Sequence, residues 1–269
     1  MIFDLNPRLT DWTGRRVWIV GATAGIGEAL ARQLAAQGAI LLLSGRNATA
    51  LEALVRELGA AHRALPLDVT DAQALDNAFA QIDTDEIPLP DIALYLAGDY
   101  TPLHATAGEA VLPVARQILT VNYSAAVEWS MRLIPRWLTS GPSTSPRGLA
   151  LVASVAGYTG LPKALAYGPS KAALIRFAEC LHIDLQPHNL GVWIINPGFV
   201  ATRLTAQNDF NMPALISPND AASEIIQGFR SGAFEIHFPK RFTRWMKLMR
   251  ILPYAWYFPL VARMTRPRP

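Results

Sequence analysis

Tyr167 and Lys171 carry the side chains of this sequence that are best suited to proton transfer. They lie four residues apart in a stretch with helical periodicity, so both side chains point to one face of the predicted helix. A free tyrosine ionises near pH ~10, and a neighbouring ammonium group stabilises the phenolate. The pair predicts an acid–base catalyst. The same spacing also arises by chance, in which case the tyrosine is exposed and stacks on the lysine stem.

A glycine-rich turn lies between an apolar run and a helical stretch near the amino end of the chain. It reads GATAGIG and contains Gly21, Thr23, Gly25, Ile26 and Gly27. Glycines let the backbone approach a diphosphate, and the N–H groups and dipole at the following helix N-terminus attract its charge. The turn therefore predicts a dinucleotide site. The alternative is a tight strand-to-helix turn without a ligand.

Arg46 follows the second predicted strand, at the place where an acid commonly binds the ribose hydroxyls of NAD. Arginine instead forms charge-assisted hydrogen bonds with a 2′-phosphate, and Thr23 can add a hydroxyl. The sequence thus predicts NADP(H) in preference to NAD(H). The alternative for Arg46 is a solvated arginine at a helix start.

The spacing G-x-x-x-G-x-G followed by Y-x-x-x-K resembles the short-chain dehydrogenases/reductases, in their ordinary single-domain branch. The resemblance covers about residues 14–239. It implies hydride transfer between NADP(H) and a carbonyl or alcohol, with Tyr167 as general acid and base. It further implies that Lys171 lowers the pKa of Tyr167 and holds the nicotinamide ribose.

The resemblance also implies roles for residues elsewhere in the chain. Ser154 is expected to hold the substrate carbonyl or alcohol, and Asn122 to bind a water that relays protons towards Lys171. A turn cap and a mid-helix structural bond are the alternatives for these two residues, and Asp68 could equally cap a helix. Further cofactor contacts are expected from Asp68, Val69, Ala97, Gly98, Pro197, Gly198, Val200 and Thr202.

One motif departs from the family pattern. The family usually has N-N-A-G after the fourth strand, whereas this sequence has Tyr95, Leu96, Ala97 and Gly98. The two asparagines that brace the sheet and line the cofactor cleft are therefore missing. Cofactor binding is still expected, because Ala97 and Gly98 permit a close approach of the nucleotide.

Short apolar runs alternate with helical patterns, as is typical of βαβ units on a parallel sheet. Unalternating runs predict buried strands at residues 16–20, 40–44, 91–96, 149–153 and 192–195, with further strands at 63–66 and 234–238. Helices are predicted over 25–37, 48–58, 71–82, 111–138, 164–186 and 217–229. The expected fold is α/β, a three-layer doubly wound, Rossmann-like parallel sheet of seven strands with helices on both faces, in one domain over 1–239.

The charge is distributed unevenly along the chain. Residues 240–269 contain eight Lys/Arg and no Asp/Glu, which leaves 16 cations and 21 acids, a net charge of −5, on residues 1–239. The lone cysteine, Cys180, is expected to be a buried helix thiol. No metal cluster and no nucleic-acid partner are expected. The N-terminus lacks a basic start followed by an apolar stretch, so a cytoplasmic location is expected.

The basic tail at 240–269 combines cations with apolar side chains. Trp245, Leu248, Met249 and Leu252 are spaced as one apolar stripe, and Arg241, Arg244, Lys247 and Arg250 fall on an adjoining face. The uncharged run 251–262 is shorter than the ~20 residues that a spanning helix needs. Two hypotheses remain open: peripheral membrane contact through residues 240–262, or packing on the protein's own domain or on a neighbouring subunit of a homo-oligomer.

Three function classes are compatible with these features. The leading hypothesis is an NADP(H)-dependent carbonyl reductase or alcohol dehydrogenase acting on a small apolar substrate. A sensor or scaffold without turnover is the second, and retention of the four catalytic residues argues against it. A nucleotide-sugar epimerase is the third, and it normally has a larger C-terminal domain than this chain offers. The predicted pocket walls are Tyr100, Val155, Tyr158, Leu161 and Phe199.

Overall fold

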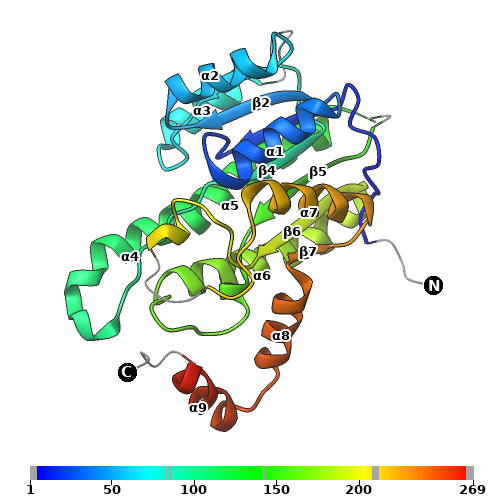
Figure 1. Ribbon diagram of the computed structural model, residues 1–269. Helices are drawn as coiled ribbons and strands as arrows, with labels where there is room; N and C mark the ends of the chain where they lie inside the picture. The colour runs from blue at the N-terminus through cyan, green and yellow to red at the C-terminus, as the bar shows by residue number, and fades with distance from the viewer. Residues whose placement is uncertain are drawn as a thin grey trace.

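A single seven-stranded parallel sheet forms the centre of the molecule (Figure 1). The structure is a computed structural model that describes residues 5–82, 84, 86–141, 143, 145–207 and 212–264. The strand order is β3-β2-β1-β4-β5-β6-β7. The strands are β1 (Arg16–Val20), β2 (Ile40–Gly45), β3 (Arg63–Pro66), β4 (Ile92–Tyr95), β5 (Arg147–Val152), β6 (Leu190–Pro197) and β7 (Glu235–Phe238). The predicted doubly wound, Rossmann-like fold is confirmed.

Helices cover both faces of the sheet and bury two hydrophobic cores. One face carries α1 (Gly25–Ala36), α2 (Ala48–Leu58) and α7 (Pro218–Arg230). The other carries α3 (Ala72–Gln81), α5 (Ala125–Thr139) and α6 (Tyr167–Leu185). Apolar side chains on both faces explain why the strand sequences do not alternate with polar residues.

The predicted long helix over 111–138 is confirmed as a helical run from Leu112 to Thr139, but it is not α-helical throughout. A 3₁₀ segment (Ala105–Val111) leads into α4 (Leu112–Leu119), and one π-helical turn (Thr120–Ser124) separates α4 from α5. Within this turn, the Val121 carbonyl accepts a hydrogen bond from the Tyr95 hydroxyl at 2.7 Å. Single π turns inside helices are found mostly at functional sites, and this one contains Asn122.

The tail forms two helices, α8 (Lys240–Arg250) and α9 (Tyr254–Met264), which extend from β7 as an arm (Figure 1). The residues of the predicted apolar stripe do not share one environment, because contact with the domain covers only one side of α8. Met246 and Met249 are buried, whereas Trp245 and Leu248 are exposed. Within the described part of the chain, no helix is long and apolar enough to cross a membrane.

The expectation for Cys180 is also wrong. Its side chain is exposed on α6. The helix has a weakly amphipathic sequence, so periodicity alone does not tell which side of it meets the sheet. Burial of this residue could be decided only by the packing of α6 on its neighbours.

Candidate active site

The predicted cofactor loop lies where β1 ends and α1 begins, at the point where the strand order reverses between β1 and β4. Ligands of open α/β sheets bind at this kind of crevice. The loop packs tightly: a Cβ on Gly27 would lie 2.2 Å from the Gly21 carbonyl oxygen, and one on Gly21 would lie 2.8 Å from the Ala97 nitrogen. Ala24 precedes α1 without a side-chain cap, so the first N–H groups of the helix meet no capping oxygen.

Arg46 lies directly after β2 and is exposed. Thr23 of the glycine loop packs against Gly45, the residue before Arg46, since a Cβ on Gly45 would lie 3.0 Å from Thr23 Cγ2. Asp68 is close enough to be affected: partial burial would raise its pKa, but hydrogen bonds from Thr70 and the charge of Arg46 lower it. The structure thus brings the loop, Arg46 and Asp68 to one edge of the sheet.

Asp68 does not cap α3. Its carboxylate accepts hydrogen bonds from the backbone N–H of Thr70 at 2.9 Å and from the Thr70 hydroxyl at 2.7 Å. The cap of α3 is Asp71, which accepts from the N–H groups of Gln73 and Ala74. The capping alternative for Asp68 is therefore removed.

Tyr167 and Lys171 occupy the first turn of α6, beside the end of β5. Lys171 Nζ lies 5.7 Å from the centre of the Tyr167 ring and donates a hydrogen bond to the Val152 carbonyl at 2.9 Å. Lys171 is 3% exposed. Ser154 follows β5, and its Oγ accepts a hydrogen bond from the Ala156 N–H at 3.1 Å. Strand β5 and helix α6 therefore hold the three side chains together.

The environment of the pair shifts both proton affinities. Burial lowers the pKa of Lys171 to about 7. Burial raises the pKa of Tyr167, a hydrogen bond with Ser154 lowers it in part, and Tyr100 raises it further. An anionic ligand nearby would favour the ammonium form and raise the pKa of Lys171 again. Of the two groups, Lys171 can therefore gain or lose a proton near neutral pH, whereas burial keeps Tyr167 as the neutral phenol.

Asn122 is held at a fixed position inside the π turn. Its Oδ1 accepts from the Asp99 N–H at 2.7 Å, and its Nδ2 donates to the Asp99 carbonyl at 2.9 Å and to Ser170 Oγ at 3.0 Å. A Cβ on Gly98 would lie 3.6 Å from Asn122 Oδ1 and 3.7 Å from Lys171 Nζ. Asn122 therefore lies close to the lysine. Its role in binding a relay water stays a prediction.

The predicted pocket walls divide into two groups. Tyr100 packs edge-on against Tyr167, with ring centres 5.0 Å apart, and Val155 is buried beside Ser154. Leu161 is half-buried on the loop that leads to α6. The hydroxyl of Tyr158, in contrast, donates to Glu235 of β7. Tyr158 therefore belongs to a polar network, in addition to any contact that its ring makes with a substrate.

Phe199 lies at the interface with the tail. Its ring centre is 5.5 Å from that of Phe242 on α8, and a Cβ on Gly198 would lie 2.9 Å from the Phe242 ring. Val200 is buried, and Thr202 lies against Gly25 of the cofactor loop. The segment after β6 thus connects the cofactor loop with α8.

Sequence reasoning missed the role of Tyr95. Its side chain is fully buried, its ring centre is 5.6 Å from that of Trp129, and its hydroxyl binds the π turn that carries Asn122. The tyrosine thus braces this turn from β4. The unusual residue at this position was recognisable from the sequence, but its partner was not, because Val121 contributes only a backbone carbonyl.

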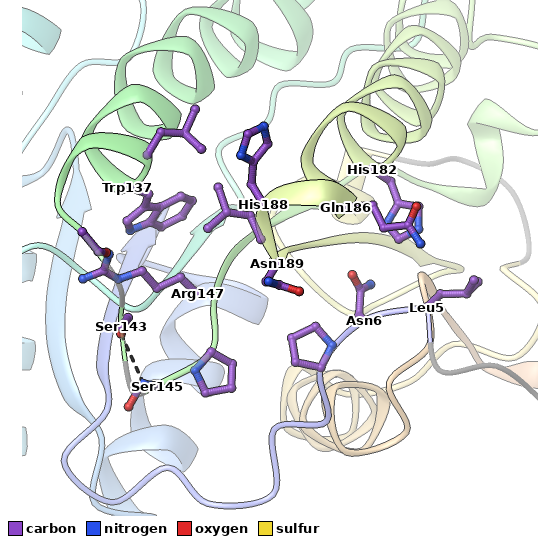
Figure 2. Close-up of a pocket in the computed structure, with 15 residues that line it drawn as sticks. Leu5, Asn6, Trp137, Ser143, Ser145, Arg147, His182, Gln186, His188 and Asn189 are labelled. Carbon is purple, nitrogen blue, oxygen red and sulfur yellow. Dashed lines mark hydrogen bonds between the residues drawn. The ribbon is translucent and has the colours of Figure 1, made fainter.

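A separate surface pocket lies at the opposite end of the sheet (Figure 2). Its walls include Asn6, Arg147, His182 and Asn189, near the starts of β5 and β6. None of the predicted site residues lines it. The candidate active site is therefore the cluster at the carboxyl ends of the strands.

Comparisons with known proteins identify the family of the chain. The family described as short chain dehydrogenase matches residues 15–212. An uncharacterized oxidoreductase of Myxococcus xanthus is 32% identical over 264 residues, covering 96% of this chain and 100% of that protein. Dehydrogenase/reductase SDR family member 7B of Xenopus laevis is 29% identical over 207 residues, which is 70% of this chain but 59% of that protein.

A solved structure has the same fold. It is a short chain dehydrogenase of Burkholderia cenocepacia in complex with NADP, with a TM-score of 0.78 at 20% identity, covering 96% of this chain and 100% of that one. The family match includes the glycine loop, Asn122, Ser154, Tyr167 and Lys171. The chain belongs to the short-chain dehydrogenase family of oxidoreductases.

Proposed function

We propose that this protein is an NADP(H)-dependent oxidoreductase that interconverts a carbonyl and an alcohol of an apolar substrate. The observation that carries the proposal is the cluster at the start of α6. Lys171 is buried beside the Tyr167 ring, and the Tyr167 hydroxyl interacts with Ser154. The cofactor loop borders the same crevice, because Gly21 packs on Ala97, and the next residue, Gly98, lies beside Lys171.

NADPH, when bound, supplies the hydride that reduces a carbonyl carbon. Tyr167 gives its hydroxyl proton to the carbonyl oxygen, so the product is an alcohol. Ser154 orients that oxygen by hydrogen bonding. The ammonium group of Lys171 stabilises the phenolate that remains on Tyr167. Oxidation of an alcohol uses the same groups in reverse, with the phenolate as the base.

The preference for NADP(H) rests on Arg46. The side chain is exposed at the carboxyl end of β2, directly after Gly45, against which Thr23 packs, and its charge acts on Asp68. The close approach of Gly21 to Ala97 leaves no room for a side chain at position 21, which fits a diphosphate bound by backbone N–H groups. The Burkholderia cenocepacia short chain dehydrogenase, which has the same fold, was solved in complex with NADP, which also supports the assignment.

Nucleotide binding tests this preference. We expect NADPH to bind more tightly than NADH by about 1–3 kcal/mol, since charge-assisted hydrogen bonds to the 2′-phosphate are strong. Arg46→Ala should remove the difference, and Arg56→Ala, an exposed arginine on α2, serves as the matched control. Fluorescence titration measures both affinities. Equal affinities of the parent protein for the two nucleotides would contradict the assignment.

An apolar substrate is proposed because apolar and aromatic side chains pack near Tyr167, beside the polar catalytic groups. Tyr100 packs against Tyr167, and Val155 and Leu161 lie on the segment after β5. A screen of carbonyl compounds for NADPH oxidation tests this proposal. Turnover that increases with the apolar character of the carbonyl compound is expected, and a preference for charged carbonyl compounds would contradict it.

We also propose that residues 240–262 contact a membrane surface peripherally. The support is the composition of the exposed side of α8 and α9, which combines aromatic rings with arginines. Sedimentation with vesicles of anionic or neutral phospholipid tests the contact. The cytoplasmic location and the homo-oligomeric state stay predictions.

A further inference from the structure

Exposed apolar side chains are concentrated on the arm formed by α8 and α9. Of the sixteen large hydrophobic side chains that are exposed in the described part of the chain, seven lie between residues 245 and 260. Monomeric proteins rarely leave large contiguous apolar patches uncovered, so such a concentration indicates a partner surface. We name this set the outer face of the arm: Trp245, Leu248, Ile251, Tyr254, Trp256, Phe258 and Leu260.

Cations accompany the outer face. Lys240, Arg241, Arg244, Arg250 and Arg263 are exposed. Residues 240–269 carry no acid, whereas residues 1–239 carry a net charge of −5. An anionic lipid surface therefore attracts the arm and repels the rest of the chain, which orients the protein. Aromatic rings beside arginines are typical of segments that lie at the boundary between headgroups and acyl chains.

The opposite side of the arm packs on the segments that border the active site. Met246, Met249 and Tyr257 are buried. The Tyr257 hydroxyl donates to the Gly160 carbonyl, on the loop between Ser154 and Tyr167. Phe242 contacts Phe199, on the segment after β6. The arm thus supports both segments that flank the catalytic pair.

A polar network also holds α8 against the segments that border the active site. Lys247 forms an ion pair with Glu235 at 2.5 Å, and Glu235 also accepts hydrogen bonds from Tyr158 and from Asn196. Burial alone would raise the pKa of Glu235, but these donors hold it below its usual value. The network ties α8 to β7, to β6 and to the segment after Ser154. The arm is therefore fixed relative to the site.

We infer that the outer face docks on an anionic phospholipid bilayer, so that the substrate entrance faces the lipid. The substrate is then an apolar carbonyl or alcohol dissolved in the bilayer. The substrate part of this inference rests on the proposed function. The chemistry is the same hydride and proton transfer at Tyr167.

The first experiment needs no catalysis. A fluorescent thiol label on Leu165→Cys, in a Cys180→Ser background, reports the entrance, because residue 165 is exposed two positions before Tyr167. The same label on native Cys180, exposed further along α6, is the control. Phosphatidylglycerol vesicles should shift the emission at 165 to shorter wavelength and leave that at 180 unchanged. No shift at 165, or equal shifts at both positions, would overturn the proposed orientation.

The second experiment separates docking from catalysis. Arg241→Glu/Arg244→Glu and Ile251→Ser/Trp256→Ser should each weaken vesicle binding by at least about tenfold. Turnover of vesicle-borne long-chain aldehyde should fall by a similar factor, while turnover of a water-soluble aldehyde stays unchanged. Ile183→Ser, on α6 and 70% exposed compared with 74% for Ile251, is the matched control and should behave as the parent.

Three further outcomes would contradict the docking on lipid, the lipid route for substrate or the proposed function. Loss of a dimer in the outer-face variants, with no vesicle binding by the parent protein, would show that a second copy covers the arm and would overturn the inference. Equal turnover of vesicle-borne aldehyde by the parent and the variants would overturn the lipid route for substrate. No oxidation of NADPH with any carbonyl would refute the proposed function, while the fluorescent label would still decide the docking.

Discussion

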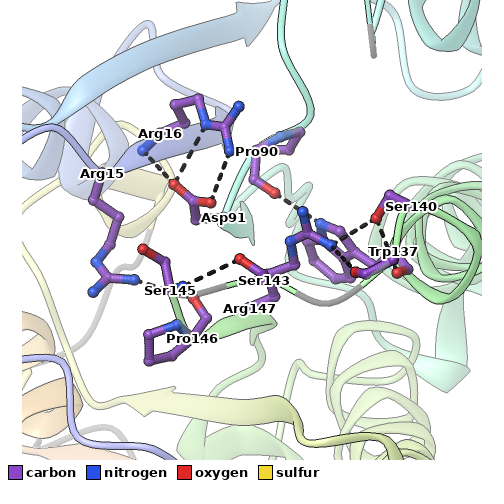
Figure 3. A network of polar contacts seen from close by, with 11 residues as sticks. Arg15, Arg16, Pro90, Asp91, Trp137, Ser140, Ser143, Ser145, Pro146 and Arg147 are labelled. Atoms are coloured by element: carbon purple, nitrogen blue, oxygen red, sulfur yellow. Dashed lines mark hydrogen bonds and ion pairs between the residues drawn. The ribbon is translucent and has the colours of Figure 1, made fainter.

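The two ends of the sheet differ in how their buried charged groups are paired. At the amino ends of the strands, the Asp91 carboxylate accepts from the backbone N–H of Arg16 at 2.9 Å and forms an ion pair with its guanidinium at 3.1 Å (Figure 3). Arg15 donates to the Pro146 carbonyl nearby. At the carboxyl ends, Lys171 is buried with the Val152 carbonyl as its acceptor, and no ion pair with a carboxylate is found for it among the described residues.

The two arrangements have different consequences for folding stability and for reactivity. A buried carboxylate that is paired and hydrogen-bonded stabilises the fold, because removal of one partner leaves an uncompensated charge. A buried ammonium without a carboxylate is unfavourable for folding, but it leaves the charge available for a ligand or for a neighbouring phenolate. The amino ends therefore hold the sheet together, and the carboxyl ends hold groups that can react.

The largest expected effect concerns the carboxyl ends. Tyr167→Phe should lower kcat by about 10³-fold, because general acid–base catalysis needs the hydroxyl. The melting temperature and the Kd of NADPH should change little, since the ring and its contact with Tyr100 are retained. Steady-state kinetics and thermal melting measure these quantities. A variant with a substantial fraction of the parent kcat would assign the proton transfer to another group.

The converse effect is expected at the amino ends. Asp91→Ala should lower the free energy of unfolding by about 2–3 kcal/mol, because the guanidinium and the backbone N–H of Arg16 lose their acceptor. The kcat and KM of the folded protein should not change. Urea denaturation measures the loss. Glu57→Ala, which removes an exposed partner of Arg32, should have a much smaller effect, and equal losses would remove the contrast between buried and surface pairs.

Lys171 should make stability depend on pH in a defined direction. Its pKa is about 7 in the folded protein and 10.5 for an unperturbed lysine side chain, so the folded state disfavours the charged form. The contribution of Lys171 to the free energy of unfolding is therefore lowest below pH 7. It rises between about pH 7 and 10.5, at up to ~1.4 kcal/mol per pH unit. Lys171→Met should be more stable than the parent at pH 6, and the difference should shrink by about 2–3 kcal/mol by pH 9.

Urea denaturation of both proteins across this pH range measures the difference. Lys240→Met, which removes an exposed lysine, should show no such trend. A constant difference between Lys171→Met and the parent would mean that Lys171 is not held neutral by burial.

The smallest expected effect concerns the brace between β4 and the π turn. Tyr95→Phe should cost about 1 kcal/mol of stability, since the Val121 carbonyl loses its donor. It should also lower kcat several-fold by loosening the turn that holds Asn122. A double-mutant cycle with Asn122→Ala measures the coupling. Additive effects of the two substitutions on kcat would show that Tyr95 stabilises the fold without positioning Asn122.

The sheet, and the positions of most candidate site residues near the carboxyl ends of its strands, could be predicted from the sequence. Continuous apolar runs identify strands that are buried on both faces, and local glycine spacing identifies the turn at the switch point, because both depend on neighbours in the chain. The match of the chain to its family also follows from these motifs. Most strand ends differ from the predicted ones by at most two residues.

The sequence does not show which side of α6 or α8 is buried, nor that the helix over 111–138 contains a π turn, because both depend on contacts between segments distant in the chain. The π turn depends on a hydroxyl from β4, 26 residues away in the chain, and no local pattern contains that contact. The inner side of α8 is set by Glu235 and Phe199, so Met249 is buried while Trp245 stays exposed. Periodicity defines the faces of a helix, but the contacts made by the rest of the molecule select the face that is buried.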